Sequence, residues 1–391
     1  MKRKIILKLI ASSLEQSLKN KDISLYSLLG GDLGIVYCLS KLSQTENINI
    51  NCDEYLEKII SSIQINPIVH SYCNGLSGLA YTLTLLQEEN VLRGVHENLY
   101  TLDEEIYNWF HTSLNIHNID PLHGAVGALY YFSKRSKYNS YFSNIVLKEW
   151  LEYLSINKSL TEDGMTMKFE RYNGPSPYNL SLSHGLSGVI VTTIDALKFI
   201  DNSTHTNAKR MLEEFGEFLI NILKFNHRNF SCFPSFYYLD RINKRNSRLA
   251  WCYGDLGIAL ALYKLGMYLN SERYIYASQK VVLHASKRRL NEDTLINDRC
   301  VCHGSCGVYS LFNFFNVNLF NGELTKTVNF WYDFTYKDVL EQPYSFKEKL
   351  AYYDNTKNKY VLKYGILEGI AGICLGLLDQ SKSLNRLIFI Q

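Results

Sequence analysis

The sequence predicts an all-α protein made of repeated helical hairpins. The phrase Gly-x-x-Gly occurs seven times at intervals of 44 to 69 residues, a period typical of repeats that each contribute a pair of helices. Most copies are followed by an apolar stretch of helical length, and the 391 residues include only six prolines. The seven copies begin at Gly31, Gly75, Gly124, Gly185, Gly254, Gly304 and Gly369.

The first expected element is an amphipathic helix at the N-terminus. Its apolar residues recur every four positions, and Lys8 interrupts the apolar run that a secretory leader would need. No stretch of about 18 apolar residues occurs, so we expect no membrane-spanning helix. The recurring apolar residues are Ile6, Ile10, Leu14 and Leu18.

The segments that follow the glycine phrases and those between them predict two classes of helix. Residues 79–86, 128–132 and 258–265 are mainly apolar and follow a phrase, which predicts buried inner helices. Residues 207–225 are more polar and carry their apolar side chains on one face, which predicts an outer helix. That face consists of Met211, Phe215, Phe218, Leu219 and Ile222.

The glycines allow close approach where inner helices begin, because a residue without a side chain lets neighbouring backbones touch. Spacing alone is compatible with an open superhelix and with a closed ring. A closed ring would bury the first and last repeats against each other, and the strongly apolar seventh copy, residues 369–373, is compatible with that arrangement.

Three regions near residues 164–181, 226–250 and 331–364 depart from the helical pattern. They are rich in turn-forming, aromatic or charged residues, and we expect them to be loop insertions in a single domain over residues 1–391. Such insertions are natural places for a substrate-contacting surface. Solvated loops without a function are the alternative for each of them.

Charge and cysteine content exclude some classes of protein. The net charge is +3 without a long basic run, which argues against nucleic acid as a partner. Nine cysteines is an odd number and they do not follow the spacing of a small disulfide scaffold. We therefore expect reduced thiols in a cytoplasmic protein.

Cysteine and histidine at the edges of two neighbouring phrases predict a metal site. Cys252 and Cys302 each lie two places before the first glycine of a phrase, and His303 follows Cys302. Two thiolates and one imidazole suit Zn²⁺, and three protein ligands leave a fourth position open, as in catalytic sites. One alternative is that these are small residues packed at a crowded helix start. Another is a closed structural site that includes Cys300 and Cys306.

Other polar residues at the phrases are candidates for proton transfer. His184 and His123 each lie directly before a first glycine, so the offset alone does not choose between them. We favour His184 for general acid–base work, with Asp120 to orient a histidine or shuttle a proton. Arg248 and Tyr253 flank Cys252 and could steady a developing negative charge.

The motifs around these residues resemble those of the lanthionine synthetase C-like family, the cyclases of lanthipeptide biosynthesis. The resemblance spans all seven repeats, and one phrase departs slightly, with Ser305 and Cys306 at positions where the family often has small or apolar residues. This leaves an extra thiol near the expected metal. The matching motifs are Arg248-x-x-Trp251-Cys252-Tyr253-Gly254, Cys302-His303-Gly304, Ser183-His184-Gly185-Leu186-Ser187-Gly188 and Leu367-Glu368-Gly369.

This resemblance implies an α/α toroid of seven inner and seven outer helices with one zinc ion per chain. The ligands it implies are Cys252, Cys302 and His303. The implied acid–base residues are His184 and Asp120. Arg248 and Tyr253 are expected nearby.

The implied reaction is a Michael addition within a dehydrated precursor peptide. A cysteine thiol adds to dehydroalanine or dehydrobutyrine and closes a lanthionine or methyllanthionine ring. No dehydratase region is evident in the sequence, so we expect a separate dehydratase, an export transporter, and peripheral membrane association through such partners.

Two other functions compete with the peptide cyclase. A protein of the same family could instead bind thiols such as glutathione or add them to other molecules. A helical toroid of the glycosidase or terpene-cyclase kind would need paired carboxylates or an Asp-rich metal motif, and neither occurs near the glycines.

Overall fold

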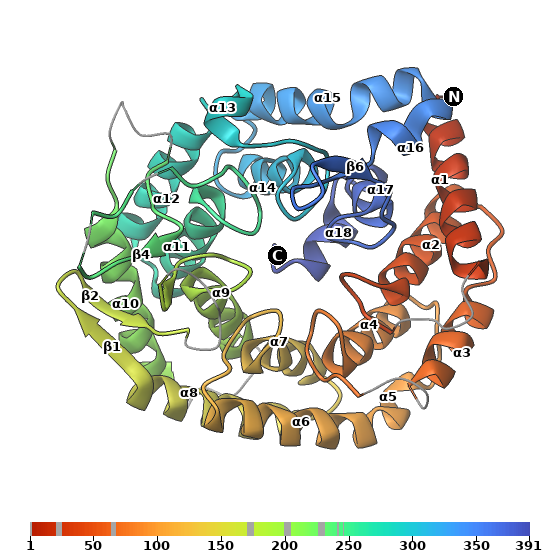
Figure 1. The fold of residues 1–391 in the computed structure, drawn as a ribbon. Helices are drawn as coiled ribbons and strands as arrows, with labels where there is room; N and C mark the ends of the chain where they lie inside the picture. The colour runs from red at the N-terminus through yellow and green to blue at the C-terminus, as the bar shows by residue number, and fades with distance from the viewer. Residues whose placement is uncertain are drawn as a thin grey trace. The chain divides into compact units, whose positions relative to one another are not determined.

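The computed structural model shows a mostly helical protein with three short two-stranded sheets (Figure 1). It describes residues 2–20, 26–63, 68–169, 176–198, 205–225, 231–240, 242–244 and 246–391. The helices that begin at a glycine phrase are α2 (Asp32–Glu46), α4 (Leu76–Glu88), α7 (Ala125–Arg135), α9 (Leu186–Leu197), α11 (Asp255–Leu269), α14 (Ser305–Asn318) and α17 (Ile370–Leu378). The second set of helices, which alternates with the first along the chain, is α1 (Lys2–Lys19), α3 (Cys52–Ser62), α6 (Tyr100–Asn115), α8 (Ser140–Asn157), α10 (His205–Ile222), α12 (Glu272–Ala285) and α15 (Thr325–Glu341).

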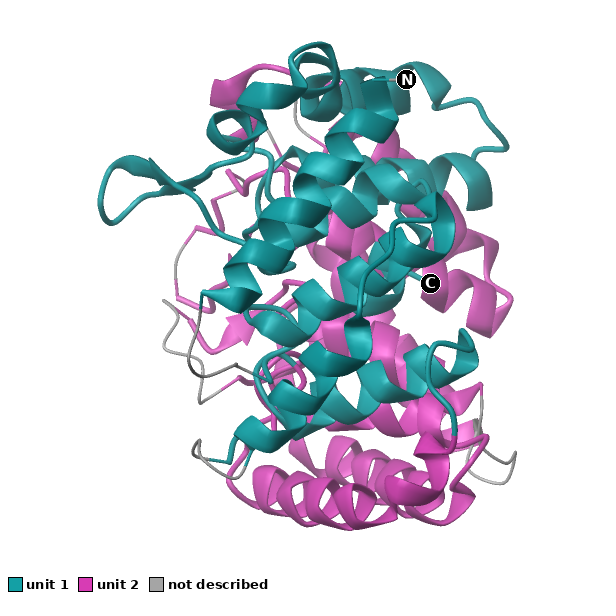
Figure 2. Ribbon diagram, turned by 90° about the vertical axis from the view of Figure 1, so that its right-hand side faces the viewer, with its two compact units in different colours: residues 1–69, 73–93, 296–391 teal, residues 70–72, 94–295 magenta. Residues whose placement is uncertain are grey.

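The chain divides into two compact units (Figure 2). Unit 1 contains residues 1–69, 73–93 and 296–391, and therefore both ends of the chain. Unit 2 contains residues 70–72 and 94–295. The expectation of a single domain stays a prediction.

The two expected classes of helix are confirmed within each unit. In unit 2, every residue of α9 is buried, whereas α10 buries one face, which includes all five apolar residues named above. In unit 1, every residue of α17 is buried. The N-terminal helix α1 is also confirmed, and its four recurring apolar residues are buried. Figure 1 shows α6, α8, α10 and α12 along one side of α7, α9 and α11.

The second glycine of each phrase lies in the first turn of its helix, and at Gly188 and Gly372 the chain of the neighbouring repeat passes close by. In unit 1, a methyl group added at Gly372 would lie 1.9 Å from the Ile366 carbonyl oxygen and 2.7 Å from the Val301 side chain. In unit 2, one added at Gly188 would lie 2.2 Å from the Leu182 carbonyl and 2.6 Å from Pro121. The glycines are therefore required by packing between repeats.

Backbone hydrogen bonds join neighbouring repeats at the residue two places before the phrase. In unit 1, the N–H of Cys302 donates to the carbonyl of Leu367 at 2.9 Å. The N–H of Leu367 donates to Leu29 at 3.0 Å, and the N–H of Leu29 donates to Cys73 at 3.0 Å. The seventh repeat thus bonds to the first within this unit, as a closed arrangement of the repeats requires.

The three small sheets lie in the expected insertions, except that strand β1 precedes the first of them. Strands β1 (Lys158–Thr161) and β2 (Gly164–Met167) pair with each other, as do β3 (Tyr178–Asn179) with β4 (Phe236–Tyr237) and β5 (Tyr352–Asp354) with β6 (Lys359–Val361). Parts of the first two insertions, residues 170–175, 226–230, 241 and 245, lie outside the described residues.

The third insertion begins later than the sequence predicts. Residues 331–341 belong to helix α15, whose Trp331, Thr335, Tyr336 and Val339 are buried on one face. The aromatic and charged composition of these residues favoured an insertion. The same composition is typical of a helix with one buried and one exposed face. The short segments after it are the 3₁₀ turn η2 (Pro343–Ser345) and α16 (Phe346–Lys349).

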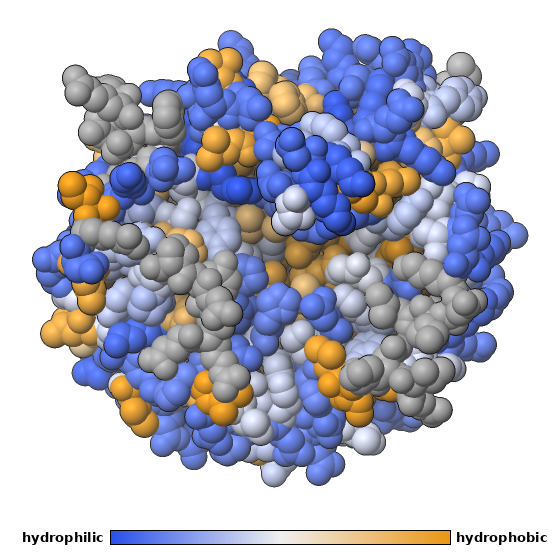
Figure 3. Space-filling view, in the orientation of Figure 1, coloured by the Kyte–Doolittle hydropathy of each residue, from blue (hydrophilic) through white to orange (hydrophobic). Residues whose placement is uncertain are grey.

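The face of the protein drawn in Figure 3 is mainly hydrophilic, with apolar residues scattered among polar ones. Among the described helices, none combines the length and the hydropathy needed to cross a bilayer. The most apolar of them, α17, has nine residues, all buried.

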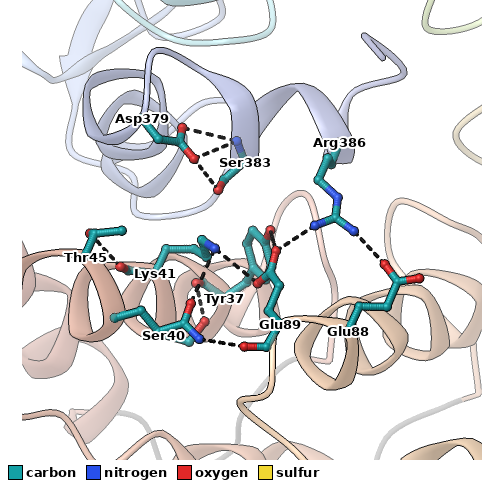
Figure 4. A network of polar contacts seen from close by, with 10 residues as sticks. Tyr37, Ser40, Lys41, Thr45, Glu88, Glu89, Asp379, Ser383 and Arg386 are labelled. Atoms are coloured by element: carbon teal, nitrogen blue, oxygen red, sulfur yellow. Dashed lines mark hydrogen bonds and ion pairs between the residues drawn. The ribbon is translucent and has the colours of Figure 1, made fainter.

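In unit 1, the C-terminal helix α18 (Lys382–Leu387) is tied to helices near the start of the chain (Figure 4). The Arg386 guanidinium contacts Glu88 at 2.7 Å and Glu89 at 2.8 Å, at the end of α4. Glu89 also pairs with Lys41 of α2 at 3.3 Å and accepts a hydrogen bond from the Tyr37 hydroxyl. Side chains therefore reinforce the contact between the chain's two ends.

Candidate functional site

The candidate residues lie in the turns that lead into the buried helices. His184 precedes α9, Cys252 and Tyr253 precede α11, and Cys302 and His303 precede α14. Because these turns carry the inter-repeat backbone hydrogen bonds, their side chains project from a rigid part of the fold. In unit 2, the Cys252 carbonyl accepts from the N–H of Leu182 and from the Ser183 hydroxyl, at 3.1 and 3.3 Å.

Gly254 is the one first glycine among the seven phrases with a left-handed backbone, with φ of +102°. A side chain there would lie 2.1 Å from the carbonyl oxygen of Arg248. The turn that presents Cys252 and Tyr253 is therefore shaped differently from the others, and only glycine fits it. Arg248 itself is half-buried, and its role in chemistry stays a prediction.

Unit 2 brings His184 and Asp120 together. Nδ1 of His184 lies 2.8 Å from Oδ2 of Asp120, and both side chains are mostly buried. The other oxygen, Oδ1, accepts the backbone N–H groups of Leu122 and His123, each at 2.8 Å. The carboxylate is thus held in place, and when Nδ1 donates to it, Nε2 of His184 is left to exchange a proton with a substrate.

Two aromatic neighbours surround His184. The ring of His123 is stacked on it at 5.7 Å, and the ring of Tyr253 lies 6.3 Å away. The Tyr253 hydroxyl accepts a hydrogen bond from Asn179 at 3.2 Å. Asn179 was not expected at the site, although its place six residues before a first glycine is a signal that could have identified it.

His123 differs from His184 in its surroundings. Loss of solvation on partial burial disfavours the charged ring and lowers the pKa of His123, although part of its side chain is exposed. Asp120 raises this pKa and His184 lowers it further. Since Asp120 hydrogen-bonds the ring of His184, and only the backbone N–H of His123, His184 is the histidine that the carboxylate orients.

In unit 1, His303 is surrounded by polar and aromatic groups. Nε2 of His303 lies 4.0 Å from Oδ2 of Asp298, and the ring of Tyr352 lies edge-on at 5.4 Å. The backbone N–H of His303 points to the sulfur of Cys300 at 3.5 Å. Cys302 and His303 are both half-buried, so a small ligand can reach them.

Cys306 is not an extra thiol beside His303. It is fully buried in α14, with its sulfur 3.3 Å from the Tyr336 hydroxyl. Burial raises the pKa of Cys306 to about 12. This corrects the expectation of a further thiol near the metal, and it removes Cys306 from a closed structural site.

Groups of histidine, cysteine and carboxylate that could hold a metal ion occur in both units. In unit 1, Asp298, Cys300 and His303 have ligand atoms within 4.8 Å of one another. In unit 2, Cys232, Asp255 and His284 do so as well. The unit 2 group is a poor cation site, because the buried Arg288 guanidinium lies 3.7 Å from Asp255.

The predicted ligand set draws Cys252 from unit 2 and Cys302 and His303 from unit 1. Its donor atoms, two thiol sulfurs and an imidazole nitrogen, fit Zn²⁺ in chemical type. All nine cysteines of the chain are present as thiols. That these three residues share one ion stays a prediction.

Comparison with known proteins identifies a family and related proteins. The family model described as lanthionine synthetase C-like protein matches residues 19–389. The nisin biosynthesis protein NisC of Lactococcus lactis subsp. lactis is 23% identical over 406 residues, covering 97% of this chain and 91% of the relative.

A solved structure, nisin cyclase, shares the fold. The TM-score is 0.75 at 20% sequence identity, and the match covers 98% of this chain and 96% of the other. Nisin cyclase is an α/α toroid, so this match confirms the predicted fold class.

Proposed function

The chain belongs to the lanthionine synthetase C-like family, and we propose that it is a zinc-dependent lanthipeptide cyclase. Its substrate would be a precursor peptide that carries cysteines together with dehydroalanine or dehydrobutyrine. The observation that carries the proposal is the His184–Asp120 pair, held beside Tyr253 within unit 2. The similarity to NisC over nearly the whole chain supports the same activity.

The proposed zinc ligands are Cys252, Cys302 and His303. The chemistry of the three donors supports zinc, and Cys252 and Cys302 occupy the same place in two consecutive repeats. Zinc bound there would hold the substrate cysteine as a thiolate, which is the nucleophilic form of sulfur. The half-buried position of Cys302 and His303 leaves room for that sulfur.

His184 is the proposed proton donor. When the substrate sulfur bonds to the β-carbon of the dehydro residue, the α-carbon needs a proton to complete the addition. A protonated His184 can supply it from Nε2, while Asp120 stabilises the positive imidazolium through Nδ1. The thiol proton released at the start of the reaction balances the proton that His184 gives up.

Tyr253 and Arg248 are proposed to support this step. The Tyr253 hydroxyl is held by Asn179 and its ring faces His184, so it can assist the negative charge that develops on the substrate carbonyl or act as the alternative donor. Arg248 is joined to the same turn through the tight contact at Gly254 and could steady that charge.

We further propose that the protein acts in the cytoplasm on a peptide modified by a separate dehydratase and later exported by a transporter. Peripheral association with a membrane would then depend on these partners. Co-purification of the three proteins from a producing cell tests this arrangement, and isolation of the chain alone under gentle lysis counts against it.

The decisive experiment uses purified protein and a peptide that carries dehydroalanine and cysteine. We expect its thiols to disappear without a change of mass, and a zinc chelator to stop the loss. Glutathione added as a competing thiol separates the two family functions. Capture of glutathione with no ring formation would support a thiol-adding protein instead.

The ligand set is tested by metal analysis. We expect about one zinc per chain in the purified protein and its loss in the Cys302→Ala variant. Cys73 lies at the same offset before its own phrase but outside the proposed set, so Cys73→Ala is the matched control and should keep its zinc. Full zinc retention by Cys302→Ala would exclude the proposed ligands.

A further inference from the structure

Resting on the proposed function, we propose that Asp298 is a positioning residue for His303. Its carboxylate faces Nε2 of His303 and thereby selects Nδ1 as the nitrogen that binds the metal. It also ties the β5–β6 hairpin to the turn that carries His303.

Asp298 occupies a position that other repeats fill with a neutral amide. It lies six residues before its first glycine, as Asn179 and Asn118 do in two repeats of unit 2. Oδ1 of Asn179 accepts the N–H two residues on at 3.0 Å, and Oδ1 of Asp298 accepts the N–H of Cys300 at 2.8 Å. An amide therefore suffices for this turn, so the turn does not explain why the sixth repeat has a carboxylate.

Burial of the Asp298 carboxylate carries a large desolvation cost if the side chain is ionised. The side chain is 1% exposed, and burying an ionised carboxylate costs far more than burying an amide unless the charge is matched by donors. The second oxygen, Oδ2, is the atom that an asparagine would replace with a hydrogen-bond donor. The function of the charge is therefore to be found at Oδ2.

Two groups face Oδ2 of Asp298. The backbone N–H of Tyr353 in β5 donates to it at 2.9 Å, and Nε2 of His303 lies 4.0 Å away. A histidine that binds a metal commonly donates its other ring N–H to a carboxylate, which orients the ring and makes it a stronger ligand. A small rotation of the His303 ring would close the 4.0 Å separation to a hydrogen bond.

The same carboxylate places the hairpin against His303. Since Oδ2 holds the N–H of Tyr353, the preceding Tyr352 ring is kept edge-on to the imidazole at 5.4 Å. The Lys363 ammonium, which follows the hairpin, lies over the Tyr352 ring, 3.9 Å from its centroid. It also pairs with Glu368 at 2.6 Å. The His303 ring thus lies close to both Asp298 and Tyr352.

Zinc affinity of the Asp298→Asn variant tests the role of the charge. We expect an affinity about 10- to 100-fold weaker, measured by competition with a chromophoric chelator, and an altered visible spectrum of the cobalt-loaded protein. Asp379 caps Ser383 in the same unit, and Asp379→Asn is the matched control, with unchanged metal binding expected. A folded Asp298→Asn variant with wild-type affinity and spectrum would overturn the proposal.

A second measurement needs no variant. In the wild-type protein loaded with ¹¹³Cd and labelled with ¹⁵N-histidine, we expect metal coupling at Nδ1 of His303 and a proton on Nε2. Coupling at Nε2 would overturn the proposal even if Asp298→Asn weakens binding for structural reasons. A protein that binds no zinc or cadmium would instead contradict the proposed function, so the two failures are distinguishable.

Discussion

At the scale of single residues, His184 and His123 differ in one contact. Both precede a glycine phrase in unit 2, and their rings are stacked. Only His184 has a ring nitrogen hydrogen-bonded to Asp120, a residue 64 positions away in the sequence. The pair is therefore an orienting carboxylate and an acid–base histidine, which is the arrangement that the proposed proton transfer needs.

Replacement of His184 by alanine separates catalysis from metal binding. We expect the variant to retain zinc and to lose about 10²- to 10⁴-fold in the rate of ring closure, the usual contribution of a general acid. Rates are measured by following peptide thiols, and zinc by metal analysis. His117, an exposed histidine that contacts Tyr153, provides the control variant His117→Ala, and unchanged cyclisation by His184→Ala would make His184 a packing residue.

Asp255 gives a prediction about pH. Burial raises the pKa of this carboxyl to about 6, against the opposing effects of Arg288 and of the N–H groups of Cys232 and Phe233. Between the ordinary value of about 4 and this value of about 6, the folded state binds the proton more tightly than the unfolded state. Stability from this group is therefore largest below about pH 4 and falls as pH rises to about 6.

Comparison with the Asp255→Asn variant isolates this effect, because other carboxyls titrate alike in both proteins. From pH 4 to 6.5 the unfolding free energy of the wild type should fall relative to the variant, by up to about 3 kcal/mol. Urea unfolding at a series of pH values measures the difference. Parallel pH profiles would show that the charge of Asp255 is already compensated in the folded protein.

At the scale of the elements, the glycine phrases join one repeat to the next. The second glycine leaves space for a carbonyl of its own turn and for a side chain of the neighbouring repeat. The residues just before the phrase carry the backbone hydrogen bonds between repeats. Each buried helix therefore begins where the repeats are most tightly joined, and candidate site residues lie in these same turns.

Substitution of Gly372 by alanine should destabilise the protein by about 1–3 kcal/mol, because its methyl group would overlap the Ile366 carbonyl. Gly30→Ala is the matched control, since its methyl group would meet its nearest neighbours at 3.6 and 3.7 Å, an ordinary contact distance. Chemical unfolding measures both variants. Equal stability of the two would show that the backbone around Gly372 relaxes without cost.

Other elements show where composition was misleading. The aromatic and charged residues 331–341 belong to helix α15, although their composition favoured an insertion. Likewise, Cys306 follows Cys302 closely in sequence but points into the core against Tyr336. In both cases the direction of a side chain on a helix, rather than its type, determines whether it is buried.

At the scale of the whole molecule, helices from the beginning and the end of the chain meet in unit 1. Backbone bonds from the seventh repeat reach Leu29, and Arg3 of α1 donates to the carbonyl of Leu378 at 2.7 Å. Arg386 of α18 also forms ion pairs with Glu88 and Glu89 at the end of α4 (Figure 4). Contacts between residues about 300 positions apart thus stabilise this unit.

Removal of the Arg386 side chain should weaken this contact. We expect Arg386→Ala to lower the unfolding free energy by about 2 kcal/mol, because Glu89 is mostly buried and would lose a charged partner. Lys58 forms an exposed pair with Glu54, and Lys58→Ala should cost no more than about 0.5 kcal/mol. Urea unfolding compares the two, and an equal loss would contradict a special role for the chain ends.

The sequence by itself determined the helical repeats, the buried or amphipathic character of the helices, and the turns that carry the candidate residues. These features are local or periodic, so they can be read from spacing and residue type. Membership of the family was also predicted from motifs, because the matching residues lie close together in the sequence.

Only the tertiary structure decided which of these residues act on one another. The pairing of His184 with Asp120, the packing of Cys306 against Tyr336, and the hydrogen bond from Tyr353 to Asp298 all join separate turns or helices. Such contacts depend on how repeats pack, and packing is not encoded in the spacing of any single motif. The physical reason is that a side chain's partner is set by the three-dimensional path of the chain, whereas a pattern records only its neighbours in sequence.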